Sequence, residues 1–292
     1  AIVVITLIGL IIFSYKNAEA LVKPKLIPPE REIEINKERG LWLDFDKYDK
    51  TDYVIEGEGG YLLNTTFVST EHTRGTGKYV IVAHGHTSSR FGSVKYVNSY
   101  IRLGFSCVIY DSRGHGSNAQ AKCTLGSIES EDMLKVIEDT RERYKDIKVL
   151  GIHGESMGSS SALIVTKYNP KIDFIVADCP NMGAYEVLSD CYNNIRLRFL
   201  AVFCRLGGKI FFGIDCKDSD AYRDLSGKCP VLFIHGAGDT FIKPYHSGRL
   251  YEKAKKNGAY AELNTEDVKA SVRKHPAVQA FIENYGKAFD GF

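Results

Sequence analysis

One serine in this sequence has the neighbours that a nucleophilic serine needs. Ser156 is the centre of a G-x-S-x-G pattern, between the apolar run 148–153 and the run 159–168, which we expect to be helical. Glycines on both sides permit the sharp strand-to-helix turn that exposes a serine hydroxyl. The helix that follows points its N–H groups toward any oxyanion formed there. We predict that Ser156 is the nucleophile of an acyl-transfer reaction, and the alternative is an ordinary Gly/Ser turn.

The other parts of such a site have candidates in the sequence. A serine hydroxyl needs a general base, a carboxylate that orients the base, and donors for the oxyanion. Asp239 fits the carboxylate because it lies in a glycine-rich turn after the apolar run 231–235 and follows the serine in the chain. A simple turn-forming role is its alternative. For the oxyanion hole we expect the backbone N–H groups of Met157 and of His86, or else Thr87.

Composition limits the class of protein. The chain has 292 residues, 44% hydrophobic and 25% charged, which suits one main domain with a large core and an insertion. A net charge of +2 with interspersed signs, and no recognisable nucleic-acid motif, argue against a nucleic-acid partner. The seven cysteines form no C-x-x-C pair, and no H-E-x-x-H occurs. We therefore expect reduced cysteines and no metal.

The N-terminal residues are strongly apolar. Residues 1–13 carry no charge, although a spanning helix needs about 20 apolar residues, and the sequence given does not start with Met. We expect residues 1–15 to be a truncated membrane anchor, and residues 16–39 a linker with an extended, proline-rich tether at 23–29. A signal-peptide core, an interfacial helix or a buried strand are alternatives. The side of the membrane stays open because charges upstream would decide it.

Beyond the linker, strand and helix patterns alternate through residues 40–292. The apolar runs 78–84, 105–111, 149–153, 174–178 and 231–235 are typical of strands covered on both faces, and 53–58 with 61–69 suggests an antiparallel pair. Amphipathic runs lie between them at 91–103, 128–144 and 156–168. The pattern predicts an α/β fold with a mostly parallel, doubly wound sheet. Residues 181–225 interrupt it, and we expect a small helical cap there rather than a plain crossover.

The motifs together resemble a known family. The chain resembles the α/β-hydrolases of the serine-esterase and serine-aminopeptidase-like type, particularly bacterial membrane-anchored members related to cinnamoyl and other carboxylic-ester hydrolases. The resemblance covers about residues 53–289 and rests on 83–90, 110–117, the Ser156 turn, 176–180 and 233–240. It implies hydrolysis of an ester, thioester or amide through an acyl-enzyme without a cofactor. It also implies that the 111–117 turn, with His115, is structural.

The candidate general base departs from the pattern of the family. In this family the order is serine, acid, histidine, and only His246 and His275 follow Asp239. His246 falls on the expected next helix, which favours His275. Family members carry the histidine in a loop, some way before a proline, whereas Pro276 here follows His275 directly. Three readings remain: a rearranged loop in which His275 serves, a lost histidine, or a stretch that departs from the natural sequence.

We therefore expect a membrane-anchored serine hydrolase of carboxylic esters with Ser156, Asp239 and His275 as its triad. Its partners would be a small ester or amide substrate and the membrane. A peptidase or amidase of the same fold is one alternative, with Asp190, Arg196 and Arg205 as candidates for reading a substrate's terminal charge. A non-catalytic, membrane-tethered ligand binder is the other. The sequence leaves the oligomeric state open.

Overall fold

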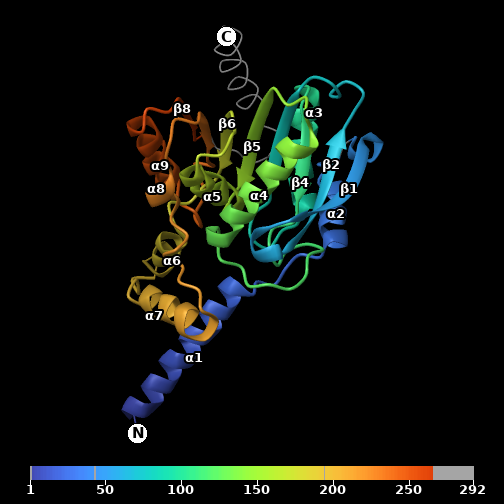
Figure 1. Ribbon diagram of the computed structural model, residues 1–292. Coiled ribbons are helices and arrows are strands. Elements are labelled where there is room, and N and C mark those ends of the chain that lie inside the picture. The colour runs from blue at the N-terminus through green and yellow to red at the C-terminus, as the bar shows by residue number, and fades with distance from the viewer. Residues whose placement is uncertain (1, 43, 194, 266–292) are drawn as a thin grey trace.

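A single eight-stranded sheet organises the computed structural model, which describes residues 2–42, 44–193 and 195–265 (Figure 1). The strand order is β1-β2-β4-β3-β5-β6-β7-β8. The bounds are β1 Asp49–Glu56, β2 Leu62–Ser69, β3 Lys78–Ala83, β4 Ser106–Tyr110, β5 Val149–Glu155, β6 Phe174–Asp178, β7 Val231–Ile234 and β8 Ala261–Asn264. β2 pairs antiparallel with β1 and β4, and every other pairing is parallel. The predicted mostly parallel sheet and the predicted antiparallel pairing of β1 with β2 are confirmed, and β2 is also antiparallel to β4.

Helices cover both faces of the sheet. The helices of the described residues, including those outside the two covering layers, are α1 Ile2–Val22, α2 Pro29–Glu38, α3 Val94–Arg102, α4 Ser127–Arg143, α5 Met157–Ile164, α6 Ala184–Asn193, α7 Leu200–Gly207, α8 Ala221–Asp224 and α9 Tyr245–Lys256. The short helices are η1 Phe45–Lys47, η2 Glu58–Gly60, η3 Arg90–Ser93, η4 Val165–Tyr168 and the π-helix η5 Gly208–Phe212. Ile81 packs with α4, α5 and α9, whereas the adjacent Val80 and Val82 pack with α3. Apolar residues on both faces are what a doubly covered strand requires. The doubly wound α/β fold is confirmed.

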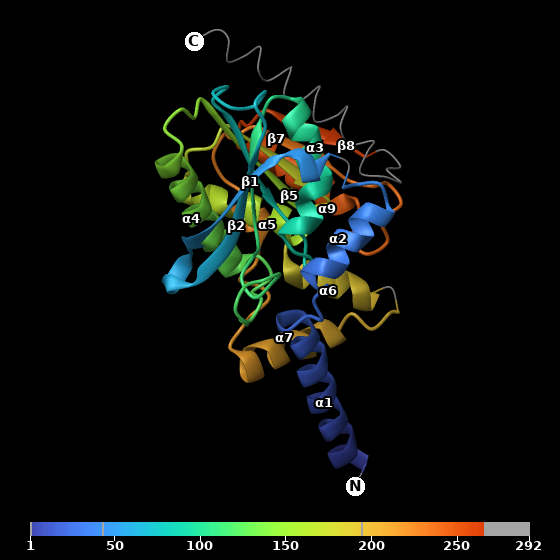
Figure 2. The same ribbon diagram turned by 90° about the vertical axis from the view of Figure 1, so that its right-hand side faces the viewer.

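A helical cap follows β6, as expected for residues 181–225. In this part of the chain α6, α7, η5 and α8 precede β7, and α6 and α7 lie beside the N-terminal helix (Figure 2). Leu188 of α6 packs with Ala201 and Cys204 of α7 in a small cluster of their own. Phe13 and Leu21 of α1 pack against the same cluster. The cap and the N-terminal helix therefore share one apolar interface.

The N-terminal region differs from the expected linker. α1 continues to Val22, seven residues beyond the expected end of the anchor, and is long and apolar enough to cross a membrane. Residues 29–38 form α2, which begins with proline at its first turn, where the missing N–H costs no hydrogen bond. Glu32 of α2 is buried and accepts hydrogen bonds from the Ser88 hydroxyl (2.5 Å) and the Ser89 N–H (2.7 Å). Within the predicted linker, only residues 23–28 and Arg39 lie outside helices.

Candidate active site

The strand-turn-helix predicted around Ser156 is present. Ser156 joins β5 to α5 at φ 53° and ψ −114°, a backbone conformation that costs free energy outside glycine. Its N–H donates to the Asp178 carbonyl at 2.8 Å. A Cβ on Gly154 would overlap the backbone of Gly158, and one on Gly158 would overlap the carbonyl of Ala83. Both glycines are thus needed for α5 to pack this closely on β3 and β5.

Ser156 lines an apolar pocket of ≈ 150 Å³. Besides the turn at Ser156, five segments that are distant in sequence form its walls: α1, the loop after β3, the segment before α4, α6 with the loop before it, and the loop after β7. The lining residues are Leu21, His86, Leu125, Ser156, Met157, Asn181, Ala184, Val187, Leu188, Cys191, Phe241 and Ile242. Mainly apolar walls with few polar groups are typical of a small-molecule site. The pocket thus brings together the serine and both residues predicted for the oxyanion hole.

The predicted oxyanion donors belong to two different segments that both adjoin the serine. Met157 is the first residue of α5, so its N–H is among those that no carbonyl of the same helix can accept. His86 lies in the loop after β3, and a Cβ on the preceding Gly85 would lie 3.4 Å from the Ser156 Cβ. The His86 ring bonds through Nε2 to the Leu21 carbonyl at 3.1 Å. Burial lowers the pKa of His86, so the neutral ring donates this bond.

Asp239 lies in the loop after β7, at the edge of the pocket. Its Oδ1 accepts the N–H groups of Phe241 (2.9 Å) and Ile242 (3.0 Å), which both line the pocket. Its Oδ2 lies 3.7 Å from Nε2 of the buried His235, a ring held by the Ile242 carbonyl and by Ser247. Asp239 therefore stabilises its turn through one oxygen, and Oδ2 is the oxygen that can orient a base.

The two candidate bases have different positions. His246 of α9 is buried, with Nδ1 accepting the Met182 N–H at 3.3 Å and Nε2 lying 3.4 Å from Asp190 Oδ2. Its contacts are with the cap and not with Ser156. His275 lies outside the described residues. β8 runs parallel to β7, with Asn264 opposite Ile234, so the chain leaves β8 at the same end of the sheet as the Asp239 loop. His275 is eleven positions after Asn264, a length of chain that spans about 36 Å when extended.

The turn after β4 is tied to the loop after β3 by a buried ion pair. Arg90 and Asp111 are bonded through their side chains, and the Arg90 N–H donates to Asp111 Oδ1 at 2.6 Å. Asp111 Oδ2 also accepts the Ser117 N–H at 2.9 Å. The side chain of Asp111 is fully buried. These bonds give the 111–117 turn a structural role and fix the loop that carries His86.

Two features near the serine were not predicted as site components. Glu155, beside the nucleophile, forms an ion pair with Lys95 of α3 at 2.6 Å. His86, His115 and Cys123 bring possible metal-ligand atoms within 4.8 Å of one another, and His115 Nε2 is buried without a hydrogen-bond partner. Tetrahedral zinc ligands lie about 3.5 Å apart, so this group would have to contract to hold a metal.

Comparisons with known proteins agree with this architecture. The family model described as serine aminopeptidase, S33, matches residues 76–210. The uncharacterized protein YqkD of Bacillus subtilis is 30% identical over 257 residues, 82% of this chain and 81% of its own. An uncharacterized membrane protein of Saccharomyces cerevisiae, YNL320W, is 25% identical over 158 residues, 52% of this chain and 50% of its own.

Solved structures resemble the fold at lower sequence identity. The Pyrococcus furiosus esterase Pf2001 superposes with a TM-score of 0.66 at 22% identity, covering 83% of this chain and 94% of that chain. Brefeldin A esterase, a bacterial homologue of human hormone-sensitive lipase, gives 0.62 at 15% identity over 89% of this chain and 84% of its own. From its sheet, its Ser156 turn and these relatives, we conclude that the chain belongs to the α/β-hydrolase superfamily.

Proposed function

We propose that this protein is a serine hydrolase that cleaves carboxylic esters through an acyl-enzyme. The observation that carries the proposal is the strained backbone of Ser156 at the wall of an apolar pocket. Such strain is kept where the surrounding structure imposes it, and functional sites are where it accumulates. Here it would hold the hydroxyl between the N–H groups of His86 and Met157, the donors proposed for the oxyanion.

The proposed reaction has two halves. The Ser156 hydroxyl oxygen attacks the acyl carbon while the base takes its proton; the bond to the alcohol then breaks, and the alcohol leaves with that proton. Water next attacks the acyl-serine, gives its proton to the base, and releases the carboxylic acid as the serine regains a proton. His275 is the proposed base and Asp239 Oδ2 the proposed orienting atom.

We also propose a division of the chain into functional parts. Residues 40–292 form the hydrolase domain, with the cap at about 181–225. The N-terminal segment is proposed to anchor the domain to a membrane. Its helix extends to Val22, so the anchor and the cap are in direct contact.

Hydrolysis of peptides with a charged end is less well supported than ester hydrolysis, although the family model is described as serine aminopeptidase. Arg205 forms two 2.7 Å bonds with Asp215, and Asp190 accepts the Tyr245 hydroxyl at 2.8 Å. Arg196 is exposed and does not line the pocket. The three residues predicted to read a terminal charge are thus engaged elsewhere or face solvent.

Labelling with a fluorophosphonate probe tests the proposed nucleophile and base. The full chain is expected to label rapidly, Ser156→Ala not at all, and His275→Ala at a severely reduced rate, because the base activates the serine. Ser117→Ala, which removes an exposed hydroxyl, is the matched control and should label like the unaltered chain. Failure of the unaltered, folded protein to label would favour the non-catalytic binder, and full labelling of His275→Ala would exclude His275 as the base.

A further inference from the structure

The cap exposes an unusual amount of apolar surface. Between Ile195 and Phe211, seven large apolar side chains are each at least 38% exposed, with Phe199 at 58% and Ile210 at 70%. We call these side chains the apolar collar; they are Ile195, Leu197, Phe199, Val202, Leu206, Ile210 and Phe211. Contiguous exposed apolar surface of this kind marks a site of association with a protein or a membrane.

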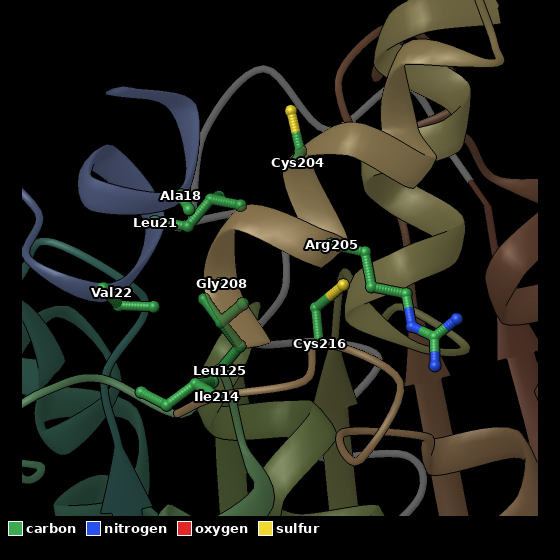
Figure 3. Close-up of a pocket in the computed structure, with 9 residues that line it drawn as sticks. All are labelled: Ala18, Leu21, Val22, Leu125, Cys204, Arg205, Gly208, Ile214 and Cys216. Carbon is green, nitrogen blue, oxygen red and sulfur yellow. The ribbon is translucent and has the colours of Figure 1, made fainter. Parts of the chain in front are cut away.

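The collar is held directly against the N-terminal helix. A Cβ on Gly207 would overlap the carbonyl of Ser14, so α7 and α1 meet backbone to backbone. Ala18, one turn further along α1, is 1% exposed and lines a small pocket together with Gly208 (Figure 3). Close approach through small residues is how helices pack within membranes, where apolar burial between helices gains little. α1 and α7 therefore behave as one packed unit.

The first half of α1 projects from this unit as an apolar rod. Eight large apolar residues between Ile2 and Ile12 are each more than 50% exposed, and both views show this end of α1 leaving the molecule beside α7 (Figures 1 and 2). A bilayer that receives this part of α1 therefore meets the collar at its surface. The packing of α1 against α7 therefore sets where the collar meets the bilayer and how deep it lies.

The charge of the collar segment matches an anionic surface. Residues 195–212 contain four basic side chains, Arg196, Arg198, Arg205 and Lys209, and no acidic one. Arg196, Arg198 and Lys209 are exposed. Apolar residues interleaved with Lys and Arg are typical of helices that lie in the bilayer interface, where the basic groups attract anionic headgroups.

We propose that the apolar collar lies in the interface of the same bilayer that α1 enters, and that the substrates are acyl esters carried in that bilayer. The substrate assignment rests on the proposed esterase function. Leu21 and Leu188 line the pocket of Ser156 and also belong to the cluster that joins α1 to the cap. The pocket thus adjoins the cluster that joins α1 to the cap, and an acyl chain would enter from the lipid on this side.

Tryptophan fluorescence tests the position of the collar without any assay of activity. The chain has one tryptophan, Trp42, which is buried in the core. In the full chain reconstituted in vesicles containing phosphatidylglycerol, Phe199→Trp and Ile210→Trp are expected to emit at shorter wavelength and to lose much of the added emission to lipids brominated on their acyl chains. Tyr260→Trp, an exposed site directly before β8, which Figure 1 shows far from α7, should not be quenched. Unquenched Phe199→Trp and Ile210→Trp would overturn the proposal, as would burial of the collar between two copies of the chain.

A second comparison separates this proposal from the proposed function. Phe199→Asp and Ile210→Asp place charges in the collar, outside the pocket of Ser156. We expect them to lower turnover of a long-chain ester dispersed in the vesicles at least tenfold relative to turnover of soluble p-nitrophenyl butyrate. An unchanged ratio would overturn the substrate assignment and leave the esterase proposal standing. Absence of turnover of both esters in the unaltered chain would instead contradict the proposed function, while the quenching result would still decide the position of the collar.

Discussion

At the scale of residues, the site is defined by backbone geometry as much as by side chains. Ser156 is strained, and its two neighbouring glycines are required by direct backbone contact with Gly158 and with Ala83. The proposed oxyanion donors are likewise backbone groups, fixed by the start of α5 and by the loop after β3. Substitution of the side chain of His86 or Met157 should therefore lower kcat less than substitution of the serine or of the proposed acid.

The proposed acid gives a first prediction. Asp239→Asn keeps the size of the side chain but removes the charge that would stabilise a protonated base, so we expect kcat for a soluble ester to fall about 10⁴-fold. The exposed Asp218→Asn, in the cap, is the matched control and should leave kcat unchanged. Steady-state kinetics measure both. A loss of less than tenfold in Asp239→Asn would show that its role is confined to the turn, where its Oδ1 bonds two N–H groups.

The buried ion pair gives a second prediction. Replacing Arg90 by Ala leaves the fully buried Asp111 without its charged partner, so the free energy of unfolding should fall by about 3–5 kcal/mol. Arg74 forms a 2.8 Å pair with Asp49 in which both side chains are more than half exposed. Arg74→Ala should cost less than about 1 kcal/mol, since exposed pairs contribute little. Urea unfolding compares the two, and equal losses would contradict a special role for the buried pair.

At the scale of elements, the N-terminal helix belongs to the site. Leu21 lines the pocket, its carbonyl bonds the His86 ring, and the Val22 carbonyl accepts the Cys123 N–H at 2.8 Å. α2 acts in a similar way, because Glu32 bonds Ser88 and Ser89 in the loop after β3. From the sequence alone, α1 was predicted to be an anchor and α2 part of a linker. In the structure both helices support the loop that carries the proposed oxyanion donor.

Two truncations test this role. Removing residues 1–12 deletes the exposed half of α1 and should leave fluorophosphonate labelling of Ser156 and the thermal midpoint nearly unchanged in detergent. Removing residues 1–22 also deletes Ala18 and Val22, which are buried, and Leu21 from the pocket wall. We expect the longer truncation to lower the thermal midpoint and to slow labelling strongly. Equal behaviour of the two truncations would show that α1 is only an anchor.

At the scale of the whole molecule, buried histidines make stability depend on pH. Burial lowers the pKa values of His84, His86 and His246, and lowers that of His115 to about 4. Each ring is thus neutral in the folded protein at a pH where an ordinary histidine, near 6.5, is charged. The unfolded chain binds more protons in this range, so stability falls as pH falls below about 6.5.

His115 allows a quantitative check. Its shift from 6.5 to about 4 corresponds to a loss of about 3 kcal/mol of unfolding free energy between these pH values. His115→Asn keeps a hydrogen-bonding side chain but cannot titrate, so its stability should fall less steeply between pH 6.5 and 4. The raised pKa of the buried Asp132 acts in the opposite direction in both proteins and leaves the comparison intact. Urea unfolding at several pH values measures the slopes, and parallel slopes would contradict the prediction.

Patterns local to a few residues were sufficient to predict much of the fold and part of the candidate site. Apolar runs predicted the parallel strands, and the glycines around Ser156 predicted the strained turn, because hydrophobic periodicity and backbone sterics act over short distances. Asp239 was predicted from its turn after β7 in the same way, and its loop does reach the pocket. The catalytic roles of Ser156, Asp239 and His275 remain predictions.

Only the tertiary structure decided how distant segments meet. Leu21 and His86 are 65 residues apart, and no local pattern indicates that the carbonyl of one holds the ring of the other. Likewise, residues 29–38 were predicted to be part of a linker. The hydrogen bonds that stabilise the buried Glu32 are made with partners 56 and 57 residues away, which no local pattern reveals. The sequence by itself determined which residues could do the chemistry. Tertiary packing determined that the N-terminal helix and the cap build the wall of the pocket, since such packing depends on shape complementarity between segments that only folding brings together.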